Sequence, residues 1–319
     1  MPDFDTTEAG SRISSQPTAK RKPEWLKVRL DSSGGYAEVK SLVRAQELHT
    51  VCEEARCPNI HECWGSHRTA SFMILGDTCT RRCRFCAVGT GLPGEVDKLE
   101  PLRVAAAVLR MGLKHAHVTM VNRDDLADGG AAMMAATVRA IRARVPECSI
   151  EVLTSDFMGS REAIRCVVES SADILSHNVE TVPRLTPLVR SRSSFSRSLD
   201  FLRIAKELDP AGITKSSLML GLGETREEVL AVLDELRSVG VDMVNIGQYL
   251  QPTTTNLPVD RYWHPDEFAE LRERALEKGF IHCESGPLVR SSYHAGEQYE
   301  GFREALARIR AGRESDPRA

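Results

Sequence analysis

Residues 71–86 read SFMILGDTCTRRCRFC, an apolar run followed directly by three cysteines at C-x3-C-x2-C spacing. A short apolar run bounded by a turn signal predicts a buried strand, here over 71–75. Cys79, Cys83 and Cys86 then lie on a loop after that strand. Three thiolates on a tight loop can hold three corners of a cubane iron–sulfur cluster and leave the fourth corner open to an added ligand.

The charge of this loop also suits metal binding, because Arg81, Arg82 and Arg84 surround the cysteines and their positive charge favours thiolate over thiol. A structural zinc site is the alternative reading. Zinc usually takes four protein ligands, whereas this loop offers three, but spacing by itself leaves zinc open.

Outward from this loop, short apolar runs alternate with longer amphipathic ones. Each predicted strand is followed by a predicted helix, which favours a parallel α/β sheet, either open or curled into a barrel. The predicted strands are 71–75, 116–121, 149–154, 173–179, 214–220 and 242–250. The predicted helices are 101–111, 131–144, 160–169, 196–208, 225–238 and 265–278.

A second cysteine triad precedes the first strand: Cys52, Cys57 and Cys63 have C-x4-C-x5-C spacing. Six of the nine cysteines therefore fall between residues 52 and 86. In a cytoplasmic chain such clustering is more typical of metal or redox sites than of disulfides. Beside the first triad, the second suggests a second cluster. Three further cysteines match no such motif: Cys148, Cys166 and Cys283. We expect core packing for Cys166 and ordinary burial for Cys283, with a competing ligand role as the alternative for Cys283 because it is close in sequence to Ser292.

Composition narrows the class of protein. The 319 residues are 41% apolar and carry a net charge of −3, so a sizeable core is expected and a broad basic surface is not. We therefore expect no nucleic-acid partner. No run of eighteen apolar residues and no signal-peptide core is present, which predicts a cytoplasmic protein without a membrane partner.

The cysteine spacing at 79–86, with Phe85 before the last cysteine, resembles the signature of the radical S-adenosylmethionine (SAM) superfamily. Both triads together resemble the lipoyl synthase family closely, over residues from about 25 to 300. Other segments carry the same resemblance: His177–Thr181 (HNVET), Gly221–Thr225 (GLGET), Gly247–Pro252 (GQYLQP) and Arg290–Ala295 (RSSYHA).

The resemblance implies a partial (β/α)6 TIM-type barrel with N-terminal and C-terminal extensions that cover an auxiliary cluster. It implies an N-terminal extension at 24–70, the barrel at 71–280 and a C-terminal extension at 281–319, whereas the composition of residues 1–23, rich in Ser, Thr, Lys and Arg, predicts a polar, poorly ordered tail. It also implies two 4Fe–4S clusters, one of which binds the co-substrate SAM. The second cluster is implied to have a serine as its fourth ligand, which here is Ser292. A hard oxygen is a poor match for iron in a sulfide cluster and should be its most labile ligand.

The implied activity is radical insertion of sulfur at C6 and C8 of an octanoyl chain on a lysine of a lipoyl carrier protein or domain, with the auxiliary cluster as sulfur donor. Further implied partners are a low-potential electron donor, such as ferredoxin or flavodoxin, and iron–sulfur assembly machinery. Two alternatives stay open. One is another two-cluster radical SAM enzyme, such as a methylthiotransferase, and the other is a non-catalytic metal-binding or redox-sensing protein.

Side chains that contact SAM are expected at the end of the fourth predicted strand, where Asn178 and, with less support, Glu180 follow His177. No residue is expected to act as an acid or base, because the radical needs no such partner. The chain departs from the family pattern near this site. Met120 and Asn122 stand where serine and aspartate are usual, and Thr154-Ser155 replaces Ile-Pro. These departures put affinity, rate or carrier preference in doubt.

Overall fold

The computed structural model describes residues 21–28, 34–67, 69–293 and 295–314, so most of the predicted 1–23 tail lies outside the described residues. Within these ranges the chain forms a curved sheet of eight strands in the order β1-β2-β5-β6-β7-β8-β9-β10. Strand β1 pairs antiparallel with β2, and all later neighbours are parallel. The strands are β1 (His49–Thr50), β2 (Ser71–Ile74), β5 (His115–Met120), β6 (Ser149–Leu153), β7 (Ile174–Ser176), β8 (Ile213–Leu220), β9 (Met243–Gln248) and β10 (His282–Gly286). A separate ribbon pairs β3 (Thr78–Cys79) with β4 (Gly89–Thr90).

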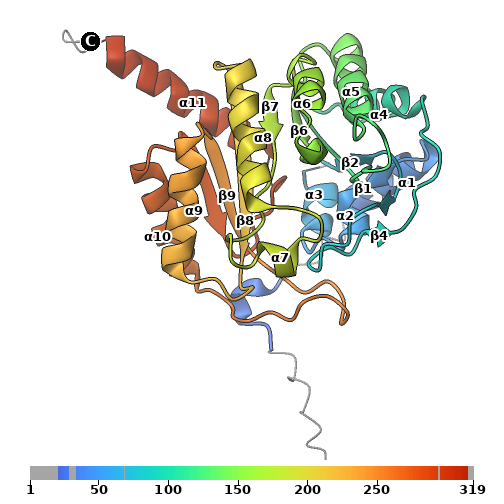
Figure 1. The fold of residues 1–319 in the computed structure, drawn as a ribbon. Coiled ribbons are helices and arrows are strands. Elements are labelled where there is room, and N and C mark those ends of the chain that lie inside the picture. Colours follow the sequence, from blue (N-terminus) through green and yellow to red (C-terminus); the bar gives the residue numbers. More distant parts are fainter. Residues whose placement is uncertain (1–20, 29–33, 68, 294, 315–319) are drawn as a thin grey trace, which may run out of the picture.

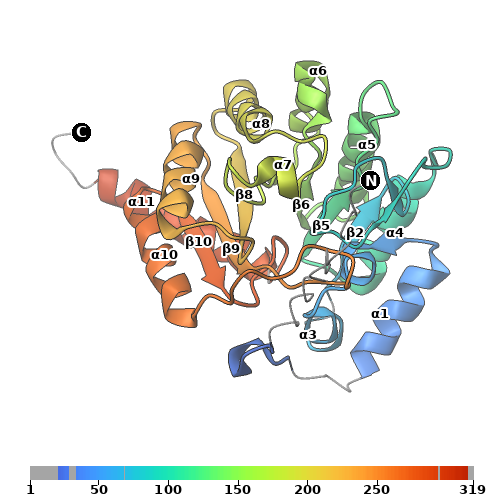
Figure 2. The same ribbon diagram turned by 60° about the horizontal axis from the view of Figure 1, so that its bottom comes forward.

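Helices line the convex face of the sheet, and the helices of residues 34–65 lie near β1 and β2 (Figures 1 and 2). Among the described helices, none is long and apolar enough to cross a membrane. The N-terminal helices are η1 (Glu24–Leu26), α1 (Gly34–Ala45), α2 (Val51–Glu54) and α3 (Ile60–Gly65). The others are α4 (Glu100–Met111), α5 (Ala131–Arg144), η2 (Phe157–Gly159), α6 (Arg161–Val168), α7 (Thr186–Val189), α8 (Phe195–Leu208), α9 (Arg226–Ser238), α10 (Pro265–Glu277) and α11 (Ala295–Glu314).

This architecture confirms the predicted partial barrel. All six predicted strands and all six predicted helices are present, with bounds that differ by at most three residues. In the described part of the chain the two edge strands of the sheet, β1 and β10, do not pair, so the barrel is open. Strand β10, which extends the parallel sheet beyond β9, was not predicted from the sequence.

Local sequence explains where the helix after β8 begins. Thr225 is the N-cap of α9, and the Thr225 side chain and Glu228 form a reciprocal capping box. Gly221 precedes this helix with φ +103°, a conformation that side chains rarely adopt. An added Cβ at Gly221 would lie 2.6 Å from the Arg261 carbonyl oxygen. Glycine is therefore required where β8 turns into α9.

Helix α11 covers the amino ends of the strands, opposite the loops that follow them (Figure 1). Its Phe302 packs with Ile174 at the start of β7 and Met243 at the start of β9, and Tyr299 packs against the same cluster. The site must therefore be approached from the carboxyl ends of the strands.

Two histidines buried in the barrel predict acid sensitivity. Burial lowers the pKa of both His117 and His177 to about 4, so the folded chain keeps them neutral. Between pH 6.5 and 4 the unfolded chain binds protons that the folded chain does not, so stability is present above pH 6.5 and falls as the pH falls. We expect the free energy of unfolding to drop by about 1–2 kcal/mol per histidine from pH 7 to pH 5. Urea denaturation followed by tryptophan fluorescence measures this drop, and His177→Gln should reduce it. A pH-independent urea midpoint would contradict the prediction.

Candidate active site

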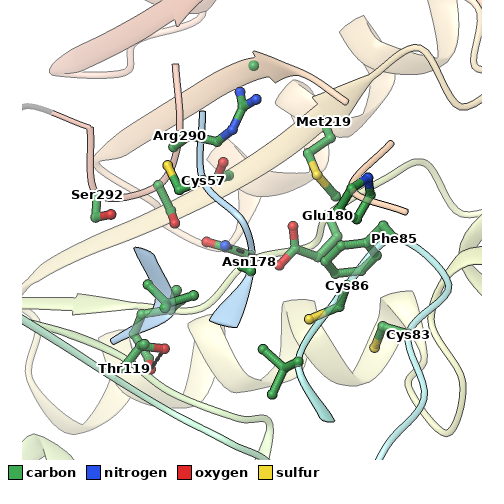
Figure 3. A pocket seen from close by; sticks show the side chains of 18 of the residues that line it. Cys57, Cys83, Phe85, Cys86, Thr119, Asn178, Glu180, Met219, Arg290 and Ser292 are labelled. Carbon is green, nitrogen blue, oxygen red and sulfur yellow. Dashed lines mark hydrogen bonds between the residues drawn. The ribbon is translucent and has the colours of Figure 1, made fainter. Parts of the chain in front are cut away.

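A cavity of about 600 Å³ opens at the carboxyl ends of the parallel strands. Its walls include five of the six clustered cysteines, together with Ser292, Asn178 and Glu180. Figure 3 shows Cys57 and Ser292 toward one side of the view, Cys83 and Cys86 toward the other, and Asn178 and Glu180 between them. The fold thus brings both cysteine motifs and the C-terminal motif, far apart in sequence, to one cavity.

The backbone of the first-triad loop is held by hydrogen bonds to three separate segments. The Thr80 amide donates to the Asn122 carbonyl after β5 (3.0 Å), and the Arg84 amide donates to the Val189 carbonyl (2.9 Å). Asn256 donates to the Cys86 carbonyl at 2.9 Å. Because each anchor comes from a loop after a different strand, the cysteine loop depends on the assembled barrel for its shape.

Arg81 clamps the same loop from within the protein. Its guanidinium binds Asp156 through two hydrogen bonds (2.6 and 3.0 Å) and Asp124 through two more (both 2.8 Å). Arg81 and Asp156 side chains are 1% and 0% exposed. Although burial raises the pKa of Asp156, hydrogen bonds and charge from Arg81 lower it well below its usual range. Arg81 therefore stabilises the conformation of the cysteine loop.

The second triad comes from α2, which contains Cys52, from the turn after it, which contains Cys57, and from α3, which contains Cys63. Cys52 and Cys57 line the cavity, whereas Cys63 is half-buried and is not part of the cavity wall. Burial raises the pKa of Cys63, and the nearby charges of Cys52 and Cys57 raise it further.

The C-terminal motif is tied to this triad by contacts that span more than 200 residues. Asn59, two residues after Cys57, donates to the Leu288 carbonyl at 2.7 Å. The Tyr293 hydroxyl donates to the Glu62 carboxylate at 3.1 Å. Ser292 lies between these two anchors and lines the cavity. The serine is thereby held on the side of the cavity that the second triad forms.

Gly247 on β9 allows the backbone of the C-terminal segment to lie close to the sheet. A Cβ added there would stand 2.1 Å from the Val289 carbonyl oxygen, three residues before Ser292. We expect Gly247→Ala to destabilise the chain by about 1–3 kcal/mol through overpacking. It should also shift the Ser292 segment and lower the iron bound per chain. The control is Gly94→Ala, because a Cβ at Gly94 meets nothing within 4 Å. Equal iron content and urea midpoints in both variants would contradict the prediction.

The electrostatics of the thiols suit metal ligands. Burial raises the pKa of Cys52 and of Cys83 to about 12, and that of Cys86 to about 11, so without a metal charge these thiols keep their protons. All nine cysteines are free, so no disulfide consumes a ligand. A bound cation deprotonates coordinating thiols, so buried thiol triads facing a cavity fit iron–sulfur clusters.

The charges that counteract the effect of burial on the thiol pKa values come from other arginines than the sequence suggested. The charge of Arg190 lowers the pKa of Cys83, and the charge of Arg290 lowers that of Cys57. The predicted role of the loop arginines is wrong for Arg81, which is paired with Asp124 and Asp156. No sequence signal identified Arg190, while Arg290 could have been found from its place beside Ser291-Ser292.

Asn178 and Glu180 both line the cavity, and Asn178 donates to the Glu180 carboxylate at 3.1 Å. Burial raises the pKa of Glu180. The Oδ1 atom of Asn178 and the hydroxyl of Thr154 are buried without a hydrogen-bond partner among the described residues. Because unpaired buried polar atoms are costly, these two fit contacts to a polar ligand such as SAM.

Other residues noted in the sequence lie elsewhere. Glu224 accepts from the Gly221 and Leu222 amides and from the Trp263 indole, which is a structural role. Cys283 is buried on β10 and is not part of the cavity wall. The departures from the family pattern do line the cavity: Met120, Asn122, Thr154 and Ser155.

Within the described residues, no three His, Cys, Asp or Glu side chains converge closely enough to hold a single metal ion.

Comparisons with known proteins agree on one family. A model of the radical SAM superfamily matches residues 73–236, and a model of the N-terminal domain of lipoyl synthase matches residues 5–57. The lipoyl synthase of Halalkalibacterium halodurans is 61% identical over 278 residues, which cover 87% of this chain and 92% of the relative. The lipoyl synthase of Bacillus cereus strain G9842 is 57% identical over 295 residues, which cover 92% and 99%.

Solved structures share the fold at low sequence identity. A methylornithine synthase, PylB, superposes with a TM-score of 0.51 at 14% identity, covering 78% of this chain and 75% of its own. SuiB from Streptococcus suis superposes with a TM-score of 0.51 at 10% identity, covering 71% and 52%. These likenesses bear on the fold alone.

Proposed function

The chain belongs to the lipoyl synthase family of radical SAM enzymes, and from this membership we propose its reaction and the residues that carry it. The chain is a sulfurtransferase that uses SAM and iron–sulfur clusters. Its substrate is an octanoyl chain amide-linked to a lysine of a lipoyl carrier protein or domain, and sulfur is inserted at C6 and C8. The observation that carries the proposal is that both cysteine motifs and Ser292 meet at one cavity.

Each cluster has its own ligand set in this proposal. Cys79, Cys83 and Cys86 hold the cluster that binds SAM, and the open fourth position is left to SAM. The auxiliary cluster is held by a second set of ligands: Cys52, Cys57, Cys63 and Ser292. The tie between Asn59 and Leu288 supports Ser292 as the fourth ligand, because it holds the serine segment beside Cys57.

The clusters, when bound, supply the electron that cleaves SAM to a 5′-deoxyadenosyl radical and the sulfide that enters the substrate. The protein orients the reacting groups toward one another and excludes water from them. Asn178 and Glu180 contact SAM between the two ligand sets, where both side chains line the cavity. No side chain needs to move a proton for hydrogen abstraction, so the proposal includes no acid or base.

Partners and location follow from the same chemistry. A low-potential donor such as ferredoxin or flavodoxin supplies electrons, and iron–sulfur assembly machinery rebuilds the auxiliary cluster. The nine free cysteines suit a reducing compartment, which we propose is the cytoplasm. The domain division also stays a proposal, with the barrel at 71–280 between extensions at 24–70 and 281–319.

One anaerobic assay tests the reaction. The reconstituted protein is given dithionite, SAM and an octanoyl-lysine peptide, and the products are analysed by mass spectrometry. We expect 5′-deoxyadenosine and a peptide that has gained two sulfur atoms. Deoxyadenosine with an unchanged peptide would favour another two-cluster radical SAM enzyme. Zinc in place of iron, with no SAM cleavage, would favour a metal-binding or redox-sensing protein.

A further inference from the structure

A buried ion pair lies inside the barrel, outside the cavity wall. Lys215 on β8 and Glu151 on β6 are 1% and 0% exposed, and their charged atoms are 3.0 Å apart. Although burial raises the pKa of Glu151, the charge of Lys215 lowers it well below its usual range, so the carboxylate stays ionised. Taking two charges out of water is costly, and such a pair is weak evidence for stability. Stability alone therefore does not explain why this ion pair is buried here.

The pair is oriented by contacts on both partners. The Ser176 hydroxyl donates to the Glu151 carboxylate at 2.9 Å. His115 and His117 also face this carboxylate, with their Nε2 atoms 3.7 and 3.8 Å from it. Glu151 is thus a fixed acceptor that holds the Lys215 ammonium in one place.

The free side of Lys215 reaches the C-terminal motif. Its Nζ donates to the Ser291 carbonyl at 2.8 Å. Asn245 on β9 donates to the Arg290 carbonyl (3.0 Å) and to the Ser291 carbonyl (3.3 Å). Two strands of the sheet therefore grip the peptide that immediately precedes Ser292.

We propose that Lys215, held by Glu151, is a positioning residue for the auxiliary cluster: it fixes the Ser291 carbonyl so that Ser292 faces Cys52 and Cys57. This inference rests on the proposed ligand role of Ser292. The Lys215 ammonium makes a short hydrogen bond to the Ser291 carbonyl. Because the ammonium is charged, this bond is roughly twice as strong as one from a neutral donor. Without this donor only the longer hydrogen bond from Asn245 holds the Ser291 carbonyl, and the weakest ligand of the cluster is the first to be lost.

The test uses the holoenzyme and removes both charges together, because Lys215→Met alone leaves Glu151 buried and unpaired. The Lys215→Met/Glu151→Gln variant keeps the shape of the pair without its charge. The readouts are the rate at which a chelator removes iron and the electron paramagnetic resonance spectrum of the auxiliary cluster. We expect auxiliary iron to leave about ten-fold faster, as for other supports of metal ligands, while SAM cleavage continues. The control is Lys206→Met, which removes a lysine that pairs with Asp242 at 2.7 Å and donates to the Gly212 carbonyl.

A double-mutant cycle with Ser292→Ala separates positioning from general structural support. If Lys215 acts through Ser292, adding the charge-removing pair to Ser292→Ala should cause no further loss of iron. Additive losses, or an unchanged rate in the charge-removing variant, would overturn the inference while the ligand assignment stands. If Ser292→Ala itself leaves the auxiliary cluster unchanged, the ligand assignment fails and the inference fails with it.

Discussion

A Cys57→Ala variant is expected to release 5′-deoxyadenosine from SAM yet to form no thiolated product. Cys57 lines the cavity on the side of Ser292, away from Cys83 and Cys86 in Figure 3. Removing it leaves the auxiliary cluster with too few ligands but leaves the SAM-binding loop intact. Sulfur insertion should fall by roughly a hundredfold or more, since even the loss of outer supports costs ten- to a hundredfold. Mass spectrometry of the peptide and chromatography of deoxyadenosine measure the two outcomes separately.

The matched variant is Cys83→Ala, which removes a ligand from the other triad. It should abolish both SAM cleavage and sulfur insertion, because the electron needed for cleavage then has no source. If Cys57→Ala lost cleavage while it kept the first cluster, or Cys83→Ala retained cleavage, the assignment of the two triads would be wrong.

An Arg81→Met variant should lose about 3 kcal/mol of stability and much of its SAM-cleaving activity. The substitution leaves Asp156 buried and Asp124 without its partner, and breaking a buried pair typically costs about 3–5 kcal/mol. Arg197 still contacts Asp156 at 2.7 Å, which places the loss at the lower end. Urea denaturation measures the stability, and iron content measures how well the cysteine loop still holds its cluster.

The neighbouring arginine provides the control. Arg82 is exposed in the same loop, and an Arg82→Met change should alter stability by less than about 0.5 kcal/mol. Equal urea midpoints for the two variants would show that the buried contacts of Arg81 do not stabilise the loop.

Much of the fold was predictable because the relevant signals are local. The helix over 225–238 was predicted to within one residue of α9, because its cap at Thr225 and its apolar residues at helical spacing are local features of the sequence. Strand β10 was missed because His282–Gly286 lacks an apolar run. Its place in the sheet comes from pairing with β9, and such pairing between distant segments leaves little trace in local sequence.

For the candidate site, too, some features could be predicted from the sequence and others could not. The two triads were visible in the sequence because cluster ligands sit close together on one loop or turn. The clamp of Arg81 by Asp124 and Asp156 was not visible, and neither was the influence of Arg190 on Cys83. Each of these contacts joins loops that follow different strands.

The alternation of strands and helices and the two ligand triads can be recognised in the amino-acid sequence, and so, through family resemblance, can the kind of reaction. The contacts between distant segments follow from tertiary folding alone, as where Asn59 donates to the Leu288 carbonyl and Lys215 to the Ser291 carbonyl. The physical reason is the range of the interactions. Helical periodicity and ligand spacing act over a few residues, whereas the cavity is formed by side chains that only the folded barrel brings together.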